Sequence, residues 1–177
     1  MSRQMWTEAL AWATSDGTAI ANSTTETIIF PNVTIPANYM QDGRVLRLRA
    51  FGKLSTTATP TVIFNIRWGG VAGTSLAVTE AITCANAAAN TGWGIEAYLQ
   101  TRTNGATGTI LASGNVTVNL TASTNTSQVF GVSGFDAPAA VTANLTADTA
   151  LSLTALWSAA SASNTLTGMH YTIESLN

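Results

Sequence analysis

Charged side chains are scarce in this 177-residue chain, where they make up only 9% of the sequence. An average globular protein has roughly 25%. Seven Lys and Arg against nine Asp and Glu give a formal net charge of −2. This scarcity excludes a chain kept disordered by its charge, and it excludes a coiled coil, which needs charged heptads. It also argues against binding through phosphate neutralisation, so we expect no nucleic acid partner.

Cysteine and histidine occur once each, as Cys84 and His170. A single Cys forms neither an intrachain disulfide nor a cysteine-based zinc site. We interpret Cys84 as a buried thiol, and His170 as a strand residue that faces solvent or another subunit. The sequence also lacks a phosphate loop, a dinucleotide fingerprint and a calcium loop. We therefore expect no enzymatic activity, no catalytic residues, no metal and no cofactor.

A small hydrolase is the enzymatic alternative, because glycosidases need only two carboxylates. Glu96 and Glu174 lie in segments with strand-like patterns. The sequence leaves open whether these two side chains face each other.

Long apolar runs are also missing. No segment approaches the roughly 18 apolar residues of a membrane span, and the first residues lack the apolar stretch of a secretory signal. We therefore expect no membrane partner, and synthesis in a cytoplasm.

Short alternating segments separated by turn residues are what the sequence does contain. Leu46, Leu48 and Ala50 alternate with Arg47 and Arg49, as in a half-buried strand. Similar alternation covers residues 61–68 and 93–102, and further strands are expected at 24–30, 107–111, 116–120, 128–132, 141–145, 151–157 and 168–176. This spacing predicts an all-β antiparallel β-sandwich of about 8–11 strands in one domain over residues 1–177. Residues 1–20 form either an edge strand or an N-terminal arm.

Partner contacts are predicted at five residues. Arg47, Arg49 and Phe51 share one face of a predicted strand, where a ring suits an interface better than free solvent. That face is either an ordinary solvated surface or a docking patch for an acidic partner or a neighbouring subunit. Trp6 and Trp12 lie near the N-terminus, where they are suited to anchor an arm in a partner's pocket.

Small uncharged residues dominate the composition, since Ala, Thr, Ser and Gly supply about half of the chain. Soluble single domains usually cover their surfaces with charge. Short uncharged side chains lose little entropy when they are immobilised, and they do not repel one another. We therefore expect a symmetric assembly of identical subunits.

Several runs resemble small virion proteins of tailed bacteriophages: residues 30–40, 43–53, 66–70, 151–158 and 163–167, with Ile173-Glu174. The resemblance implies a jelly-roll-like sandwich and a homotrimeric capsid decoration, or cement, protein. Its implied partner is the major capsid protein, and its implied location is the capsid surface of the virion after synthesis in the host bacterium. The alternative is a tail-fibre or receptor-binding module that binds a glycan. The resemblance carries over no catalytic residue.

Overall fold

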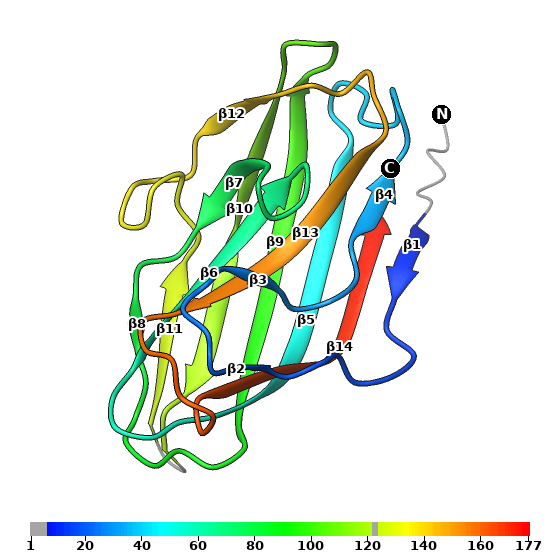
Figure 1. Cartoon of the computed structure of the whole chain (residues 1–177). Helices are drawn as coiled ribbons and strands as arrows, with labels where there is room; N and C mark the ends of the chain where they lie inside the picture. The colour runs from blue at the N-terminus through cyan, green and yellow to red at the C-terminus, as the bar shows by residue number, and fades with distance from the viewer. Residues whose placement is uncertain (1–6, 122–123) are drawn as a thin grey trace.

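The computed structural model describes residues 7–121 and 124–177, which fold into two antiparallel sheets packed face to face (Figure 1). The predicted all-β sandwich is therefore confirmed. The larger sheet has the strand order β1 (Glu8–Trp12), β14 (Thr165–Ser175), β5 (Val45–Ser55), β9 (Thr91–Thr103), β10 (Gly108–Asn119) and β11 (Asn125–Val129). Two short strands extend it, since β2 (Ile20–Ala21) pairs with β14 and β12 (Ala140–Ala143) pairs with β10.

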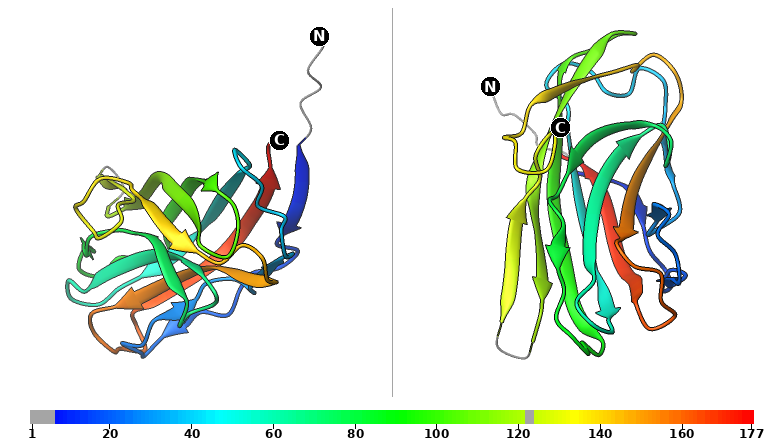
Figure 2. Two further views of the ribbon diagram at one scale, coloured as in Figure 1. Left: turned by 90° about the horizontal axis from the view of Figure 1, so that it is seen from above. Right: turned by 60° about the vertical axis from the view of Figure 1, so that its left-hand side comes forward.

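The smaller sheet has the order β3 (Thr27–Ile28), β13 (Thr149–Trp157), β6 (Thr61–Trp68) and β7 (Thr74–Val78). In addition, β4 (Val33–Ile35) pairs with β13 and β8 (Ile82–Thr83) pairs with β6. Figure 2 shows the two layers from the side and from above. The chain crosses between the layers from β5 to β6 and again from β13 to β14, so strands that neighbour one another in a sheet are often distant in sequence.

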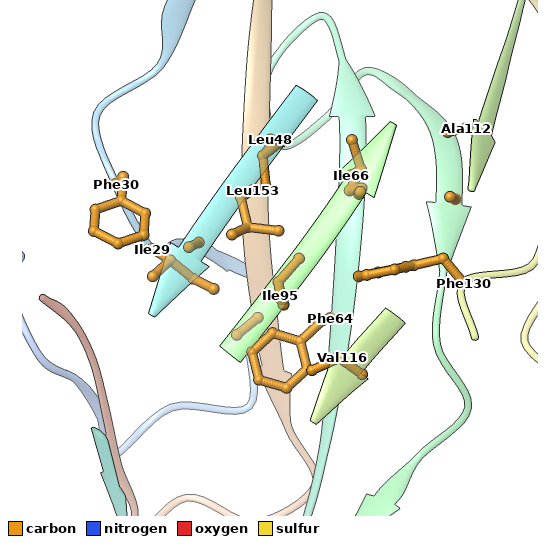
Figure 3. Close-up of a cluster of buried hydrophobic side chains, with 14 of the residues drawn as sticks. Ile29, Phe30, Leu48, Phe64, Ile66, Ile95, Ala112, Val116, Phe130 and Leu153 are labelled. Atoms are coloured by element: carbon orange, nitrogen blue, oxygen red, sulfur yellow. The ribbon is translucent and has the colours of Figure 1, made fainter. Parts of the chain in front are cut away.

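The core fills the space between the two sheets. Strand side chains point alternately to opposite faces, so the apolar members of each alternating segment meet in the middle. Figure 3 shows Leu48 and Ile95 from the large sheet and Ile66 and Leu153 from the small sheet in this cluster, and all four are buried. The predicted inward faces of residues 44–54, 61–68 and 93–102 are confirmed by this burial.

Three of the five tryptophans lie in this core and have hydrogen-bonded indoles. Trp68 Nε1–H donates to the carbonyl of Asn144 at 3.0 Å, and Trp93 Nε1–H donates to that of Lys53 at 3.3 Å. Trp157 is 1% exposed, which confirms its predicted core position together with that of Trp68. Burial of an indole without such a partner costs free energy, so these bonds let large rings fill the core.

One side of the sandwich is closed by backbone bonds between the layers. The N–H of Val78 donates to the carbonyl of Gly131 at 2.8 Å, and the N–H of Gly131 returns a bond to Val78 at 3.1 Å. Between this bridge and β11, Phe130 is buried in the core. The chain therefore turns a corner after β11 and joins the small sheet.

Several predicted boundaries are wrong. The strand expected at 24–30 shrinks to β3, because the buried side chains of Ile29 and Phe30 follow it outside the ladder. The two strands expected at 107–111 and 116–120 are one long strand, β10. Strand β7 has no counterpart in the sequence prediction. For residues 1–20 the sequence left open an edge strand or an N-terminal arm. Glu8–Trp12 form the edge strand β1.

A partly buried ion pair lies on the outer face of the small sheet. Glu26, just before β3, accepts bonds from Arg67 Nε and Nη2, both at 2.6 Å. The hydroxyl of Thr154, which is fully buried, donates to the same carboxylate. Burial alone raises the pKa of Glu26, but the bonds from Arg67 and Thr154 outweigh it and leave the pKa below its ordinary value. The segment before β3 is thereby fastened across β13 and β6.

We predict that Glu26→Gln lowers the free energy of unfolding by about 1–3 kcal/mol, because it leaves the Arg67 guanidinium without its anion. A carboxylate with a lowered pKa stabilises the fold above its unfolded pKa, and this contribution is lost as the pH falls through the folded pKa. Urea unfolding of Glu26→Gln should therefore depend less on pH below about 4.5 than that of the wild type. Asp136→Asn, at an exposed loop position, is the control, and an equal loss in both variants would contradict the prediction.

Candidate interaction face on the large sheet

The predicted contact residues of β5 lie on the outer face of the large sheet. Because Leu46, Leu48 and Ala50 are buried in the core, the odd-numbered side chains of β5 must point outward. Strand β5 lies between β14 and β9, so its outward side chains have cross-strand neighbours on both sides. The structure thus brings Arg47, Arg49 and Phe51 together, as the sequence predicted.

Each arginine of this group contacts a carboxylate, and the two carboxylates lie on opposite sides of β5. Arg47 contacts Glu174 of β14, with Nη2 2.5 Å and Nε 2.8 Å from the same carboxylate oxygen. Arg49 Nε lies 3.8 Å from a carboxylate oxygen of Glu96 on β9. The hydrogen bonds that Arg47 donates to Glu174 raise the pKa of the Arg47 guanidinium, although partial burial opposes this shift. These four side chains carry no net charge, so they do not form the basic patch that an acidic partner would need.

An aromatic ring is held next to the ion pairs. Phe51 lies over Gly94 of β9, where an added Cβ would come within 2.9 Å of the ring. On the other side, the ring stacks with His170 of β14 at a centroid distance of 6.2 Å. Phe51 is still 44% exposed, so it is fixed in position and remains accessible. Tyr98 is a second exposed ring, and its hydroxyl donates to Glu96 at 2.9 Å.

Trp12 lies at the edge of the same face. It is opposite Thr172 of β14, which in turn is opposite Arg49, so Trp12 is two strands from β5. Adjacent strands are roughly 4.8 Å apart, which puts about 10 Å between Trp12 and the row of β5. Trp12 is 59% exposed. Trp6, the other predicted contact, lies outside the described residues.

We use the term interaction face for the outward side chains on β1, β14, β5 and β9 that surround Phe51. Its members are Trp12, Arg47, Arg49, Phe51, Lys53, Glu96, Tyr98, His170, Thr172 and Glu174. The sequence analysis did not include Tyr98 among the contact residues. Its alternation with the buried Ala97 and Leu99 nevertheless indicates that its side chain points outward. The sequence analysis also treated the two glutamates only as possible catalytic groups. No short-range signal identifies them as arginine partners, because Arg47 and Glu174 are 127 residues apart.

An open groove of about 550 Å³ lies beside the interaction face. Its lining includes Trp12, Asp16, Ile28, Phe30 and Tyr171, and it lies between the segment after β1 and the segment around β3. Burial raises the pKa of the Tyr171 phenol. The groove is therefore mainly aromatic and aliphatic, with polar side chains toward the loop.

The side chains that could act in catalysis or bind a metal do not come together in one site. Glu96 and Glu174 lie on opposite sides of β5, so they do not face each other as a carboxylate pair. Glu174 accepts hydrogen bonds from Arg47, whereas Glu96 lies 3.8 Å from Arg49 Nε. Cys84 is buried as predicted, and burial raises the pKa of its thiol to about 11. Within residues 7–121 and 124–177, no three His, Cys, Asp or Glu side chains converge where they could hold a metal ion. The same residues include no helix that is long and apolar enough to span a membrane.

No protein-family model, curated protein or solved structure matches this chain.

We predict that the two arginines differ in their contribution to stability. The Arg47 and Glu174 side chains are 28% and 22% exposed, whereas those of Arg49 and Glu96 are 43% and 41% exposed and farther apart. Arg47→Ala should therefore lower the free energy of unfolding by about 0.5–1 kcal/mol, and Arg49→Ala by about 0–0.5 kcal/mol. Urea unfolding at low and high salt measures both values. A larger loss for Arg49→Ala would refute this ranking.

Proposed function

We propose that this chain is a structural virion protein of a tailed bacteriophage. In this proposal it is a homotrimeric capsid decoration protein, and it binds the major capsid protein on the outside of the head. The interaction face is the observation that carries this proposal. It combines accessible aromatic rings with two arginines that are paired with glutamates of the same subunit. The resemblance of residues 30–40, 43–53, 66–70, 151–158 and 163–167, with Ile173-Glu174, to phage virion proteins is the reason for proposing a phage particle.

The energetics of such a face favour binding to another protein surface. Protein interfaces are enriched in aromatic side chains and in Arg, and their centres are depleted in Lys, Glu and Asp. Phe51 is fixed between Gly94 and His170 before any partner arrives, so little side-chain entropy is lost when it is covered. Arg47 and Glu174 neutralise each other, so covering them leaves no isolated charge behind.

Binding to an assembled shell stabilises that shell. A protein that binds the assembled state and not the free subunits shifts the equilibrium toward assembly by mass action. A trimer seated among several capsid subunits spreads the outward load of packaged DNA across them. An interface of roughly 800 Å² per partner is sufficient for specific binding.

A receptor-binding module of a tail fibre is the second candidate. It is favoured by the exposed Trp12 and Phe51 rings on one sheet face, because aromatic rings also bind the apolar faces of sugars. The two candidates share the fold, so only their ligands separate them.

Co-sedimentation with empty expanded phage capsids tests the proposal. The purified protein should pellet with capsids and raise their melting temperature, and Phe51→Ala should weaken binding by roughly tenfold or more. Phe135→Ala is the matched control, because it removes a more exposed ring from the loop between β11 and β12, away from the interaction face. Equal effects of the two changes would remove the interaction face from the proposal.

A glycan array and light scattering distinguish the remaining outcomes. The proposed function requires a trimer and no specific glycan binding. Binding to one class of glycan, lost in Trp12→Ala or Phe51→Ala without any capsid binding, would instead establish the receptor-binding candidate.

A further inference from the structure

The groove beside the interaction face is a preformed feature of the fold. Its volume is about 550 Å³, and it lies between the loop that follows β1 and the segment around β3. Two backbone bonds hold that loop in place, from the N–H of Ala13 to the carbonyl of Tyr171 at 3.0 Å and from the N–H of Gly17 to that of Gly168 at 2.7 Å. The ring of Phe30 packs against Tyr171 at a centroid distance of 4.4 Å. The walls of the groove are therefore fixed before any ligand arrives.

The lining of the groove combines apolar side chains with a free carboxylate. Ile28 is half-buried, and Trp12 at the rim is largely exposed. Asp16 is exposed, and within the described part of the chain its carboxylate forms no hydrogen bond or ion pair. An apolar side chain gains free energy by covering such a surface, and a carboxylate attracts a cation. The matching occupant therefore has a large apolar side chain with a positive charge a few residues away.

A segment of this chain meets both requirements. Residues 1–6 have the sequence Met-Ser-Arg-Gln-Met-Trp and precede β1, outside the described residues. Met5 and Trp6 are adjacent apolar residues, and Arg3 is the only charged side chain of the six. Trp and Arg are the side chains that most often anchor interfaces, and Met adapts to irregular pockets. The segment therefore has the chemistry that the groove would bind.

Trp6 does not reach the groove of its own subunit. Strand β1 begins at Glu8, and the groove begins four residues later, at Trp12. Figure 1 shows β1 running from the end of the sandwich at which the C-terminus lies toward the loop that lines the groove. The Cα atom of Trp6 lies within about 7 Å of that of Glu8, because two residues span no more. Trp12 lies roughly 13 Å from Glu8 along the strand. Trp6 can therefore occupy this groove only in another subunit.

We propose that residues 1–6 of one subunit dock in the groove of the next, with Trp6 against Ile28 and Trp12 and with Arg3 beside Asp16. This inference rests on the homotrimer of the proposed function and gives that trimer its contact. The contact is heterologous, because it joins two different surfaces, and it closes into a ring when three subunits are related by a threefold axis. Each subunit then donates one segment and receives one, so all three grooves are filled.

The proposed contact is separate from the centre of the interaction face. The groove and the interaction face share Trp12, but no residue that lines the groove comes from β5 or β9. Docking of residues 1–6 therefore does not use Phe51 or the arginines beside it. Variants can separate trimer formation from capsid binding.

Light scattering across a concentration series tests the contact. Trp6→Ala should raise the concentration at which the trimer dissociates by roughly tenfold or more, because it removes the ring that fills the groove. Phe135→Ala is the matched control, since it removes an exposed ring from the loop between β11 and β12. Equal effects of the two changes, or no effect of Trp6→Ala, would overturn the proposal.

Exchange of two charges tests the placement of Arg3. Arg3→Asp and Asp16→Arg should each weaken the trimer, because each brings two like charges together, and the double variant should recover most of the loss. Asp136→Arg, at another exposed loop position, is the control and should leave the mass unchanged. A double variant no stronger than the weaker single variant would refute the placement of Arg3 beside Asp16.

Cross-linking identifies which subunit supplies the segment. A bismaleimide added to Gln4→Cys combined with Thr18→Cys, which lies in the groove, should produce covalent dimers and trimers of the 18.3 kDa chain. Gln4→Cys combined with Asn115→Cys is the matched control, because Asn115 is exposed on β10 and does not line the groove. The natural Cys84 is buried and stays unreactive. Cross-linked monomers alone, or equal yields from both pairs, would count against docking between subunits and overturn it.

The same measurements separate this contact from the proposed function. A wild-type chain that is only monomeric would overturn the homotrimer and, with it, the contact. A stable trimer that is unaffected by Trp6→Ala would overturn the contact alone and leave the proposed function standing. Phe51→Ala should show the converse, with capsid binding weakened and the trimer intact.

Discussion

The alternation of β5 in the middle of the large sheet is the constraint on which both the core and the interaction face depend. Its even-numbered Leu and Ala side chains meet the small sheet, so Arg47, Arg49 and Phe51 must face outward. A shift of one residue would bury the arginines and expose Leu46 and Leu48. Burial of these aliphatic side chains therefore fixes the register, and the register in turn determines which groups from β14 and β9 lie beside the arginines.

The sequence predicted the fold where one face of a strand is apolar and the other polar. Strands β5, β6 and β9 satisfy this condition, and their inward residues are those expected. The prediction failed where burial does not alternate. The segment around Ile29 and Phe30 carries apolar side chains that are buried outside a ladder. Strand β10 was split at Ser113-Gly114, although a Cβ at Gly114 would lie 2.2 Å from the carbonyl of Glu96, so this glycine marks close strand contact and no turn.

The interaction face was only partly predictable, because its chemistry arises from pairing between distant strands. Alternation placed Arg47, Arg49 and Phe51 on one side, but it gave no information about their neighbours. Whether the arginines form a basic patch depends on Glu174 and Glu96, which reach them only through the strand order β14-β5-β9. Composition gives the number of charges, whereas topology determines which of them cancel.

The same scarcity of charge connects the interaction face with β11, the strand at one edge of the large sheet. With seven basic and nine acidic residues, the chain has few charges to distribute. Arg47, Arg49 and Arg67 each lie in an ion pair with a glutamate on or next to a strand of the same sheet. A lysine or glutamate on β11 would protect that edge, yet this strand contains only Asn, Thr, Ser, Gln and Val. A surface that is covered mainly by short polar side chains thus has few charged residues with which to protect its strand edges.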